Sequence, residues 1–219
     1  MRLVFLGPPG AGKGTQAELL SERRRVKVLA SGNILREAIR NGDPIGKEAA
    51  RCMEEGVLVP DQLITDLILH RLKPVSNGDS FVLDGFPRTV LQAQSLDAWL
   101  KQRGQAGIDL AVDFEISEGA IVRRLAGRRI CKGCGANYHL QNLPPKREGL
   151  CDRCGKELGF RSDDDLGTIG KRLVVYHQET EPLLSFYRKQ NKLRRVPGEL
   201  AIEAQYEALL DLLKKERLV

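Results

Sequence analysis

The sequence has few aromatic side chains and no long apolar run. Aromatic residues make up 5% of the 219 residues, and no apolar run reaches the roughly 18 residues of a membrane-spanning helix. Only four apolar residues, at positions 3–6, follow Met1 and Arg2, which is too short for the apolar part of a signal peptide. We therefore expect a cytoplasmic protein that has no membrane partner.

Histidine is also scarce, and acidic residues are outnumbered. The chain has 3 His, 35 Lys and Arg and 29 Asp and Glu, which gives a net charge of +6. The histidines, at 70, 139 and 177, form no Ser/His/Asp arrangement, so we expect each to be structural or exposed. An excess of positive charge suits nucleic acid, but it equally suits a cleft that holds several phosphates. The basic run at 23–25 lacks interleaved aromatic residues, which favours a solvated helix end and predicts no nucleic-acid partner.

What the sequence does contain is an alternation of short apolar strands and helices. Strands are expected at 2–6, 26–29, 80–84, 110–116 and 193–196. Helices are expected at 13–24, 33–41 (with Ser31 as N-cap), 46–55, 61–72, 91–103, 120–128, 168–189 and 202–215. This alternation predicts an α/β fold in which helices cover both faces of a parallel sheet. Nothing suggests a large exposed apolar stripe, so a monomer is expected.

A glycine-rich loop stands between the first strand and the first helix. Residues 7–15 read Gly-Pro-Pro-Gly-Ala-Gly-Lys-Gly-Thr. The glycines let backbone N–H groups turn toward phosphate oxygens, and the helix N-terminus adds partial positive charge. Lys13 supplies a full, mobile charge for the outer phosphates. This context predicts a site for a nucleoside triphosphate.

The residue after Lys13 departs from the commonest form of this loop. That form continues Gly-Lys-Ser/Thr, with the hydroxyl bound to Mg²⁺. Here Gly14 follows Lys13 and Thr15 comes one position later, which argues against direct ligation by a loop hydroxyl. Asp84, at the end of a buried strand, is the expected carboxylate near Mg²⁺, acting through water.

Arginines at the ends of several elements predict a second phosphate site. Arg88 follows Asp84 in the segment Asp84-Gly85-Phe86-Pro87-Arg88, and ligands of open α/β sheets bind at the carboxyl ends of strands. The other arginines near element ends are Arg36, Arg124, Arg128, Arg129, Arg161 and Arg172. Their grouping around one cleft favours a ligand with several phosphates.

Four of the five cysteines occur as two Cys-x-x-Cys pairs. Cys131 and Cys134 are separated by 16 residues from Cys151 and Cys154. This spacing predicts a structural zinc site with four thiolate ligands, although iron also accepts four thiolates. Residues 131–160 contain few aliphatic side chains, so the metal is expected to hold this segment together. Cys52 stands apart and is expected to pack in a core.

The motifs together resemble those of the adenylate kinases, in their long-lid bacterial or archaeal form. The resemblance covers essentially the whole chain. Its motifs are the loop at 7–15, Ser31-Gly32-Asn33-Ile34-Leu35-Arg36, the segment 56–61, Asp84-Gly85-Phe86-Pro87-Arg88-Thr89 with Gln92, Gly127-Arg128-Arg129, and Tyr176-His177-Gln178. The resemblance implies a three-layer P-loop fold with a central parallel sheet, a small helical insertion for the nucleoside monophosphate and a zinc-ribbon-like lid. The implied domains are a core of 1–29, 60–126 and 165–219, a monophosphate-binding domain of 30–59 and a lid of 127–164.

The resemblance also implies roles for individual residues. An ATP site is implied at Gly10, Ala11, Gly12, Lys13, Gly14, Thr15, Arg124, Arg128, Asn137 and Tyr138. An AMP site is implied at Ser31, Gly32, Arg36, Val57, Leu58, Val59, Gly85, Phe86, Arg88, Gln92, Arg161 and Arg172, with Gln92 at the adenine edge. The implied catalytic set is Lys13, Asp84, Arg88, Arg124, Arg128, Arg161 and Arg172. Two departures from the family pattern are Asn33, where Asp is usual, and Leu166-Gly167, where an acidic pair is usual.

The expected reaction is the magnesium-dependent transfer ATP + AMP ⇌ 2 ADP, so the expected partners are small nucleotides. Phosphate oxygens are largely anionic at neutral pH, so the acceptor requires no general base. Charge neutralisation by Lys13, Mg²⁺ and the arginines would carry the reaction. Two alternatives stand beside it: a kinase with another donor or acceptor base, and a zinc-ribbon NTPase that binds nucleic acid.

Overall fold

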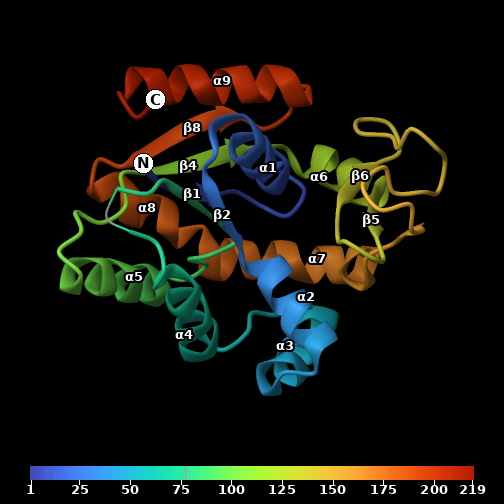
Figure 1. The fold of residues 1–219 in the computed structure, drawn as a ribbon, viewed down its shortest axis with the longest axis horizontal. Coiled ribbons are helices and arrows are strands. Elements are labelled where there is room, and N and C mark those ends of the chain that lie inside the picture. The colour runs from blue at the N-terminus through green and yellow to red at the C-terminus, as the bar shows by residue number, and fades with distance from the viewer. Residues whose placement is uncertain (77) are drawn as a thin grey trace.

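A central parallel sheet organises the molecule. The structure is a computed structural model that describes residues 1–76 and 78–219. In that part of the chain, five parallel strands lie in the order β2-β3-β1-β4-β8 (Figure 1). They are β1 (Arg2–Leu6), β2 (Lys27–Ala30), β3 (Phe81–Asp84), β4 (Leu110–Glu115) and β8 (Leu193–Pro197). The expected parallel sheet is confirmed, and its strands begin and end within about two residues of the predicted positions.

Helices cover both faces of this sheet because its strands carry apolar residues on both sides. In β1, Leu3 and Phe5 pack with α1 (Lys13–Arg24) and α9 (Ile202–Lys215). Val4 and Leu6 point to the opposite face. There they pack with α4 (Asp61–Leu72), α5 (Val90–Gln102) and α8 (Pro182–Lys189). In Figure 1, α9 lies on one side of the sheet and α4 and α5 lie on the other. The three expected layers are therefore present.

Two helices after β2 form a small insertion. They are α2 (Ser31–Asn41) and α3 (Pro44–Glu55), which pack against each other. Ser31 is the first residue of α2 and not its N-cap, since Ala30 occupies that position. The Ser31 hydroxyl instead donates to the backbone oxygen of Gly85, at 2.6 Å. The predicted capping role was therefore wrong, because the hydroxyl finds a partner across the sheet edge.

A second, smaller sheet forms the lid. Its strands are β5 (Arg128–Cys131), β6 (Asn137–His139) and β7 (Leu158–Gly159), in the antiparallel order β6-β5-β7. Helix α6 (Glu118–Ala126) ends before Arg128, which the sequence placed in that helix. In Figure 1 this lid projects to the right, beyond α6 and α7 (Leu166–Val175).

The expected helix at 168–189 is divided in the structure. A short 3-10 turn, η1 (Ser162–Asp164), leads into α7, and a π-helical segment, η2 (Tyr176–Thr180), separates α7 from α8. Pro182 begins α8, where its missing N–H costs nothing. Arg172 and Tyr176 are four residues apart, so they share one helical face, and both line the cleft described below. Among the described residues, no helix combines the length and the apolar character needed to cross a membrane.

Candidate functional site

A large cleft lies at the carboxyl ends of the core strands. Its volume is about 720 Å³. It is walled by the glycine-rich loop, the α2–α3 insertion, the segment after β3, the lid and the segment before α9. Elements far apart in the sequence therefore meet at one edge of the sheet, as expected for an open α/β fold.

The glycine-rich loop forms the floor of the cleft. Gly7, Gly10 and Gly12 have φ values of +129°, +85° and +95°, which favour glycine. At Gly12 an added Cβ would lie 2.8 Å from the amide oxygen of Gln205. The Gln205 amide nitrogen donates to the backbone oxygens of Ala11 and Pro197. The loop is thus held from behind by α9, which leaves its front free for a ligand.

Lys13 reaches back over the loop that precedes it. Its ammonium donates to the backbone oxygens of Gly7, at 2.7 Å, and Pro8, at 2.8 Å. Burial lowers the pKa of Lys13 to about 8, and Asp84 opposes this while neighbouring arginines reinforce it. A desolvated ammonium among other cations gains the most from an anionic ligand, so Lys13 is suited to bind phosphate.

Besides Arg123, six predicted arginines from five parts of the chain (α2, the segment after β3, α6, the lid and α7) face the same cleft. They are Arg36, Arg88, Arg124, Arg128, Arg161 and Arg172. Burial lowers the pKa of Arg88 to about 10 and that of Arg161 to about 9, with nearby arginines adding to the effect. The buried Arg161 Nε has no hydrogen-bond partner among the described atoms. Such a concentration of buried positive charge indicates a polyanionic ligand.

Two aspartates hold part of this cluster in place. The Arg128 guanidinium donates to both carboxylate oxygens of Asp164. Arg172 donates to the backbone oxygen of Asp163 at 2.9 Å and to the Asp164 carboxylate at 3.2 Å. Despite burial, the surrounding arginines, Arg172 first among them, keep the pKa of Asp163 below its ordinary value. These carboxylates fix the direction of the arginines without neutralising the whole set.

The opposite side of the cleft carries the predicted monophosphate-site residues. Ser31, Gly32, Arg36, Val57, Leu58, Val59, Gly85, Arg88 and Gln92 all line it. Arg88 Nε donates to the Gly85 backbone oxygen at 2.9 Å, and Arg36 donates to Asn33 at 2.8 Å. The amide of Gln92 is already engaged: it accepts from the Arg88 backbone N–H at 2.7 Å and donates to Asp61 at 2.6 Å.

Two predicted contact residues have side chains outside the cleft. Phe86 is fully buried and packs in the core between the sheet, α4 and α5. Ala11 is also buried, in the core between the sheet, α1 and α9. The motifs that contain these two residues do border the cleft. Because the apolar side chains of Phe86 and Ala11 pack in the core, the two residues can offer a ligand only their backbone groups.

Several cleft residues escaped the sequence reasoning. Glu18, on α1, faces the lid, and burial raises the pKa of its carboxyl group. Glu199, Leu200, Ala201, Ile202 and Gln205 close the cleft beside Arg124, whose guanidinium donates to the Leu200 backbone oxygen at 3.2 Å. Glu18 lies one helical turn after Gly14 and Thr15, and that spacing could have revealed it. No local signal marks the 199–202 segment.

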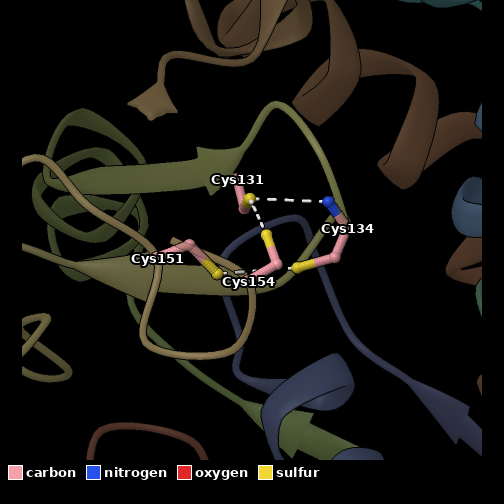
Figure 2. Close-up of side chains that lie close together, drawn as sticks. All are labelled: Cys131, Cys134, Cys151 and Cys154. Carbon is pink, nitrogen blue, oxygen red and sulfur yellow. Dashed lines mark hydrogen bonds between the residues drawn. The ribbon is translucent and has the colours of Figure 1, made fainter. Parts of the chain in front are cut away.

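The four paired cysteines meet in the lid (Figure 2). Their sulfur atoms all lie within 4.8 Å of one another. Cys131 and Cys154 are separated by 3.4 Å, and Cys134 and Cys151 by 3.5 Å. These distances far exceed the ~2.05 Å of a disulfide, and they are close to the ~3.8 Å between sulfurs of a tetrahedral zinc site with Zn–S bonds near 2.3 Å.

Backbone groups in the lid also favour a bound metal. The backbone N–H groups of Gly133 and Cys134 donate to Cys131 Sγ at 3.3 and 3.4 Å. Such bonds stabilise a thiolate, the form that binds metal. Four converging thiolates without a cation would repel one another. The residues present therefore fit a metal ion held by four cysteines.

Lid residues link this four-cysteine cluster to the cleft. Asn137 accepts from Arg161 at 2.7 Å and lies 3.4 Å from Glu18 of α1. Tyr138 also lines the cleft, but its hydroxyl points away from it, to 3.5 Å from Cys151 Sγ. The arrangement as a whole defines a P-loop protein with a second, arginine-lined region in the same cleft and a lid built around cysteines.

Comparison with known proteins agrees with this class. The family model described as adenylate kinase matches residues 5–192. The chain is 46% identical over 204 residues to adenylate kinase from Moorella thermoacetica, covering 93% of this chain and 94% of that protein. It is 47% identical over 193 residues to the Caldicellulosiruptor bescii adenylate kinase, covering 88% and 89%. It is 43% identical over 215 residues to that of Archaeoglobus fulgidus, covering 98% and 99%. The chain belongs to the adenylate kinase family, which confirms the resemblance found in its motifs.

Proposed function

We propose that this protein catalyses ATP + AMP ⇌ 2 ADP, with two nucleotides bound in the one cleft. The observation that carries the proposal is the convergence of Lys13 with arginines from α2, the segment after β3, α6, the lid and α7 on one cleft. A single triphosphate bound at the glycine-rich loop would not require cations on both the lid side and the α2 side of the cleft. Two nucleotides joined at their terminal phosphates would use them all.

The donor nucleotide would occupy the side bounded by the loop and the lid. The backbone of Gly10–Thr15 and the Lys13 ammonium face its phosphates, and Arg124, Arg128, Asn137 and Tyr138 face the same space. Asp84 lies beside the loop, with its carboxylate oxygen 3.2 Å from a Cβ built on Gly14. This placement fits Mg²⁺ held near Asp84, and the ion would neutralise charge on the bridging phosphate oxygens.

The acceptor would occupy the side bounded by α2, α3 and the segment after β3. Arg36 and Arg88 face its phosphate, and Val57, Leu58 and Val59 border its base. Both groups of the Gln92 amide are engaged by Arg88 and Asp61. To bind the adenine edge, Gln92 would release its bond to Asp61 and donate to the base. Arg161 and Arg172 line the same cleft and would contact the phosphates of both nucleotides.

Transfer itself needs alignment and charge, and no proton acceptor. The acceptor phosphate is already anionic, so the protein has only to overcome repulsion between two polyanions. Arginine suits this task because its planar group binds two oxygens at once and stays charged. The lid would exclude water, which competes with the acceptor for the phosphoryl group.

We further propose that the cysteine site holds structural zinc. Four thiolates close a tetrahedron and leave no position open for substrate, so the metal would stabilise the lid without entering the reaction. The parts of the chain then correspond to a core (1–29, 60–126 and 165–219), a monophosphate-binding domain (30–59) and a lid (127–164). We propose that the protein acts as a cytoplasmic monomer on free nucleotides.

The proposal is tested by initial rates over a panel of nucleotides. ATP, GTP and CTP are each paired with AMP, GMP, CMP and UMP, and phosphate release is measured without any acceptor. We expect AMP to be the best acceptor and hydrolysis without acceptor to be slow. A different preferred acceptor would assign another base specificity, and rapid ATP hydrolysis stimulated by nucleic acid would overturn the kinase assignment.

A further inference from the structure

Strand β6 carries two kinds of side chain on its two faces. Successive residues of a strand point in opposite directions. Asn137 and His139 therefore share one face, and Asn137 contacts Arg161 of the cleft. Tyr138 occupies the other face and packs with Cys131, Ala136 and Cys151 in the small lid core. This one strand thus separates the nucleotide cleft from the cysteine site.

The hydrogen bonds of the Tyr138 hydroxyl determine which way its proton points. The backbone N–H of Asp152 donates to Tyr138 Oη at 2.8 Å. A hydroxyl that accepts this bond retains its own proton for donation. Cys151 Sγ lies 3.5 Å from the same oxygen and is part of the four-cysteine cluster. Tyr138 is only 7% exposed, so water competes little for that proton.

We propose that Tyr138 is a positioning residue for the lid metal, donating a hydrogen bond from its hydroxyl to the Cys151 thiolate. Through this bond it fixes Cys151 in its binding direction and offsets part of the negative charge that four thiolates leave around a divalent cation. Outer groups of this kind commonly change metal affinity by 10- to 100-fold. The inference rests on the metal site proposed above, and it adds a role for Tyr138 other than contact with the donor nucleotide.

Because Tyr138 also forms part of the cleft wall, the bond connects metal occupancy to the donor site. The hydroxyl holds the loop at Asp152, next to Cys151, and the neighbouring Asn137 holds Arg161. A metal that draws Cys151 into place would hold β6, and with it the Asn137 amide, in one position. Loss of the hydroxyl should loosen that connection while leaving the cysteines themselves intact.

The test uses the nucleotide-free, full-length protein loaded with Co²⁺ or Zn²⁺, so it does not depend on kinase activity. In Tyr138→Phe, removal of the hydrogen bond raises the energy of the sulfur lone pairs. The sulfur-to-cobalt charge-transfer band should therefore move to longer wavelength. Zinc should also pass to an excess of a colorimetric chelator on the order of 10-fold faster than in the unsubstituted protein.

Tyr187→Phe is the matched control. Tyr187 is a fully buried tyrosine of the core whose hydroxyl has no hydrogen-bond partner among the described atoms. This variant should keep the band position and the release rate of the unsubstituted protein. The proposal is overturned if Tyr138→Phe keeps the band position, or if both variants release zinc within twofold of the unsubstituted rate.

A second substitution at the same position guards against a simple packing defect in Tyr138→Phe. Placing 3-fluorotyrosine at position 138 alone keeps the ring and the hydroxyl, and makes the phenol a stronger donor. The charge-transfer band should then move to shorter wavelength, opposite to the shift in Tyr138→Phe. Shifts in the same direction for both substitutions would show a packing effect and would contradict the proposed hydrogen bond.

Discussion

The core and the lid reach a stable structure by different means. The core buries two large apolar clusters, one on each face of a five-stranded sheet. The lid buries little more than Cys131, Ala136, Tyr138 and Cys151, with Leu158 packed against them. Burial of apolar surface is the main driving force of folding, so a segment with so little of it needs another source of stability. The proposed metal site would supply one.

The core and the lid also have different expected roles: the core residues act on the transferred phosphate, and the lid encloses the bound nucleotide. The core positions Lys13 at the start of α1, Asp84 at the end of β3 and Arg88 in the segment that follows β3. The lid contributes Arg128, Asn137 and Arg161 from short strands and connecting segments. Damage to the core residues should therefore affect the chemical step, and damage to the lid should affect nucleotide retention and water exclusion. The following predictions test that division, beginning with the largest expected effect.

Replacing Lys13 by Met should reduce kcat by about 10²- to 10³-fold, the usual cost of removing one preorganised charge at a transition state. The lid should be unaffected, so metal content should stay the same. Steady-state rates and metal analysis measure both effects. Lys101→Met, at the exposed end of α5, should retain full activity. A loss in Lys13→Met below fivefold would mean that Lys13 is not in contact with the transferred group.

Replacing Cys131 by Ser should remove the metal and unfold the lid locally. Structural zinc can contribute on the order of 10 kcal/mol, far more than the small lid core can replace. Hydrogen exchange should lose protection in residues 127–164 and keep it in β1, β3 and β4, while KM for the donor rises. Cys52→Ser, at the isolated buried thiol, should keep its metal. Full metal content in Cys131→Ser would contradict the ligand assignment.

Activity should fall as pH rises through the pKa of Lys13. That pKa is lowered to about 8 by burial, so the protonated form that binds phosphate is lost above this value. The ratio kcat/KM for the donor, which reports the free enzyme, should fall about tenfold per pH unit beyond it. A ratio that stays constant to pH 9.5 would contradict the role given to Lys13.

The lowered pKa of Lys13 should also make the unfolding free energy of the protein depend on pH. Between about 8 and 10.5 the unfolded chain holds a proton on Lys13 that the folded chain lacks. The unfolding free energy of the nucleotide-free protein should therefore rise with pH across this window. Lys13→Met should lose that part of the slope, which denaturant titrations at pH 7.5 and 9.5 would detect. An unchanged slope would show that Lys13 titrates normally.

The smallest predicted effect concerns contact between the lid and α1. Arg153, between Cys151 and Cys154, lies 2.9 Å from Glu22 and 4.0 Å from Glu18. Exposed pairs of this kind contribute about 1 kcal/mol or less, so Arg153→Ala should raise donor KM only about two- to threefold at low salt. Exchanging the charges, with Arg153→Glu and Glu22→Arg together, should restore it.

A second ion pair provides the control for this contact. Lys132 and Glu157 lie 3.2 Å apart, and both belong to the lid. Because their pair does not reach the core, Lys132→Ala should leave donor KM unchanged. Equal effects of Arg153→Ala and Lys132→Ala would show a general loss of lid stability and no specific contact with α1.

Much of this arrangement could be predicted from the sequence, because its signals are local. The glycine-rich loop with Lys13 needs only its own backbone and the helix that follows. The cysteine spacing likewise predicted the cluster, since two short turns suffice to bring four sulfurs together. The strand order, with β3 between β2 and β1, was not predicted, because no local pattern encodes it.

The details that could not be predicted depend on partners distant in the sequence. Gln92 is engaged by Asp61, 31 residues away. Ser31 finds Gly85 in place of a capping bond. The hydroxyl of Tyr138 turns to a cysteine 13 residues later. In each case a polar group forms a hydrogen bond with a partner that only the tertiary structure brings close. No periodicity or spacing in the sequence predicts such a partner.

The central claim is that one cleft aligns two nucleotides between a rigid core and a metal-stabilised lid. It is tested most directly by a crystal structure of the zinc-loaded protein with two adenosines joined through five phosphates. The account predicts one adenosine beside Arg124 and residues 199–202, the other beside Gln92, and the phosphates between Lys13, Arg88, Arg161 and Arg172. Binding of a single adenosine, with the second disordered in solvent and the arginines near α2 free of phosphate, would contradict it.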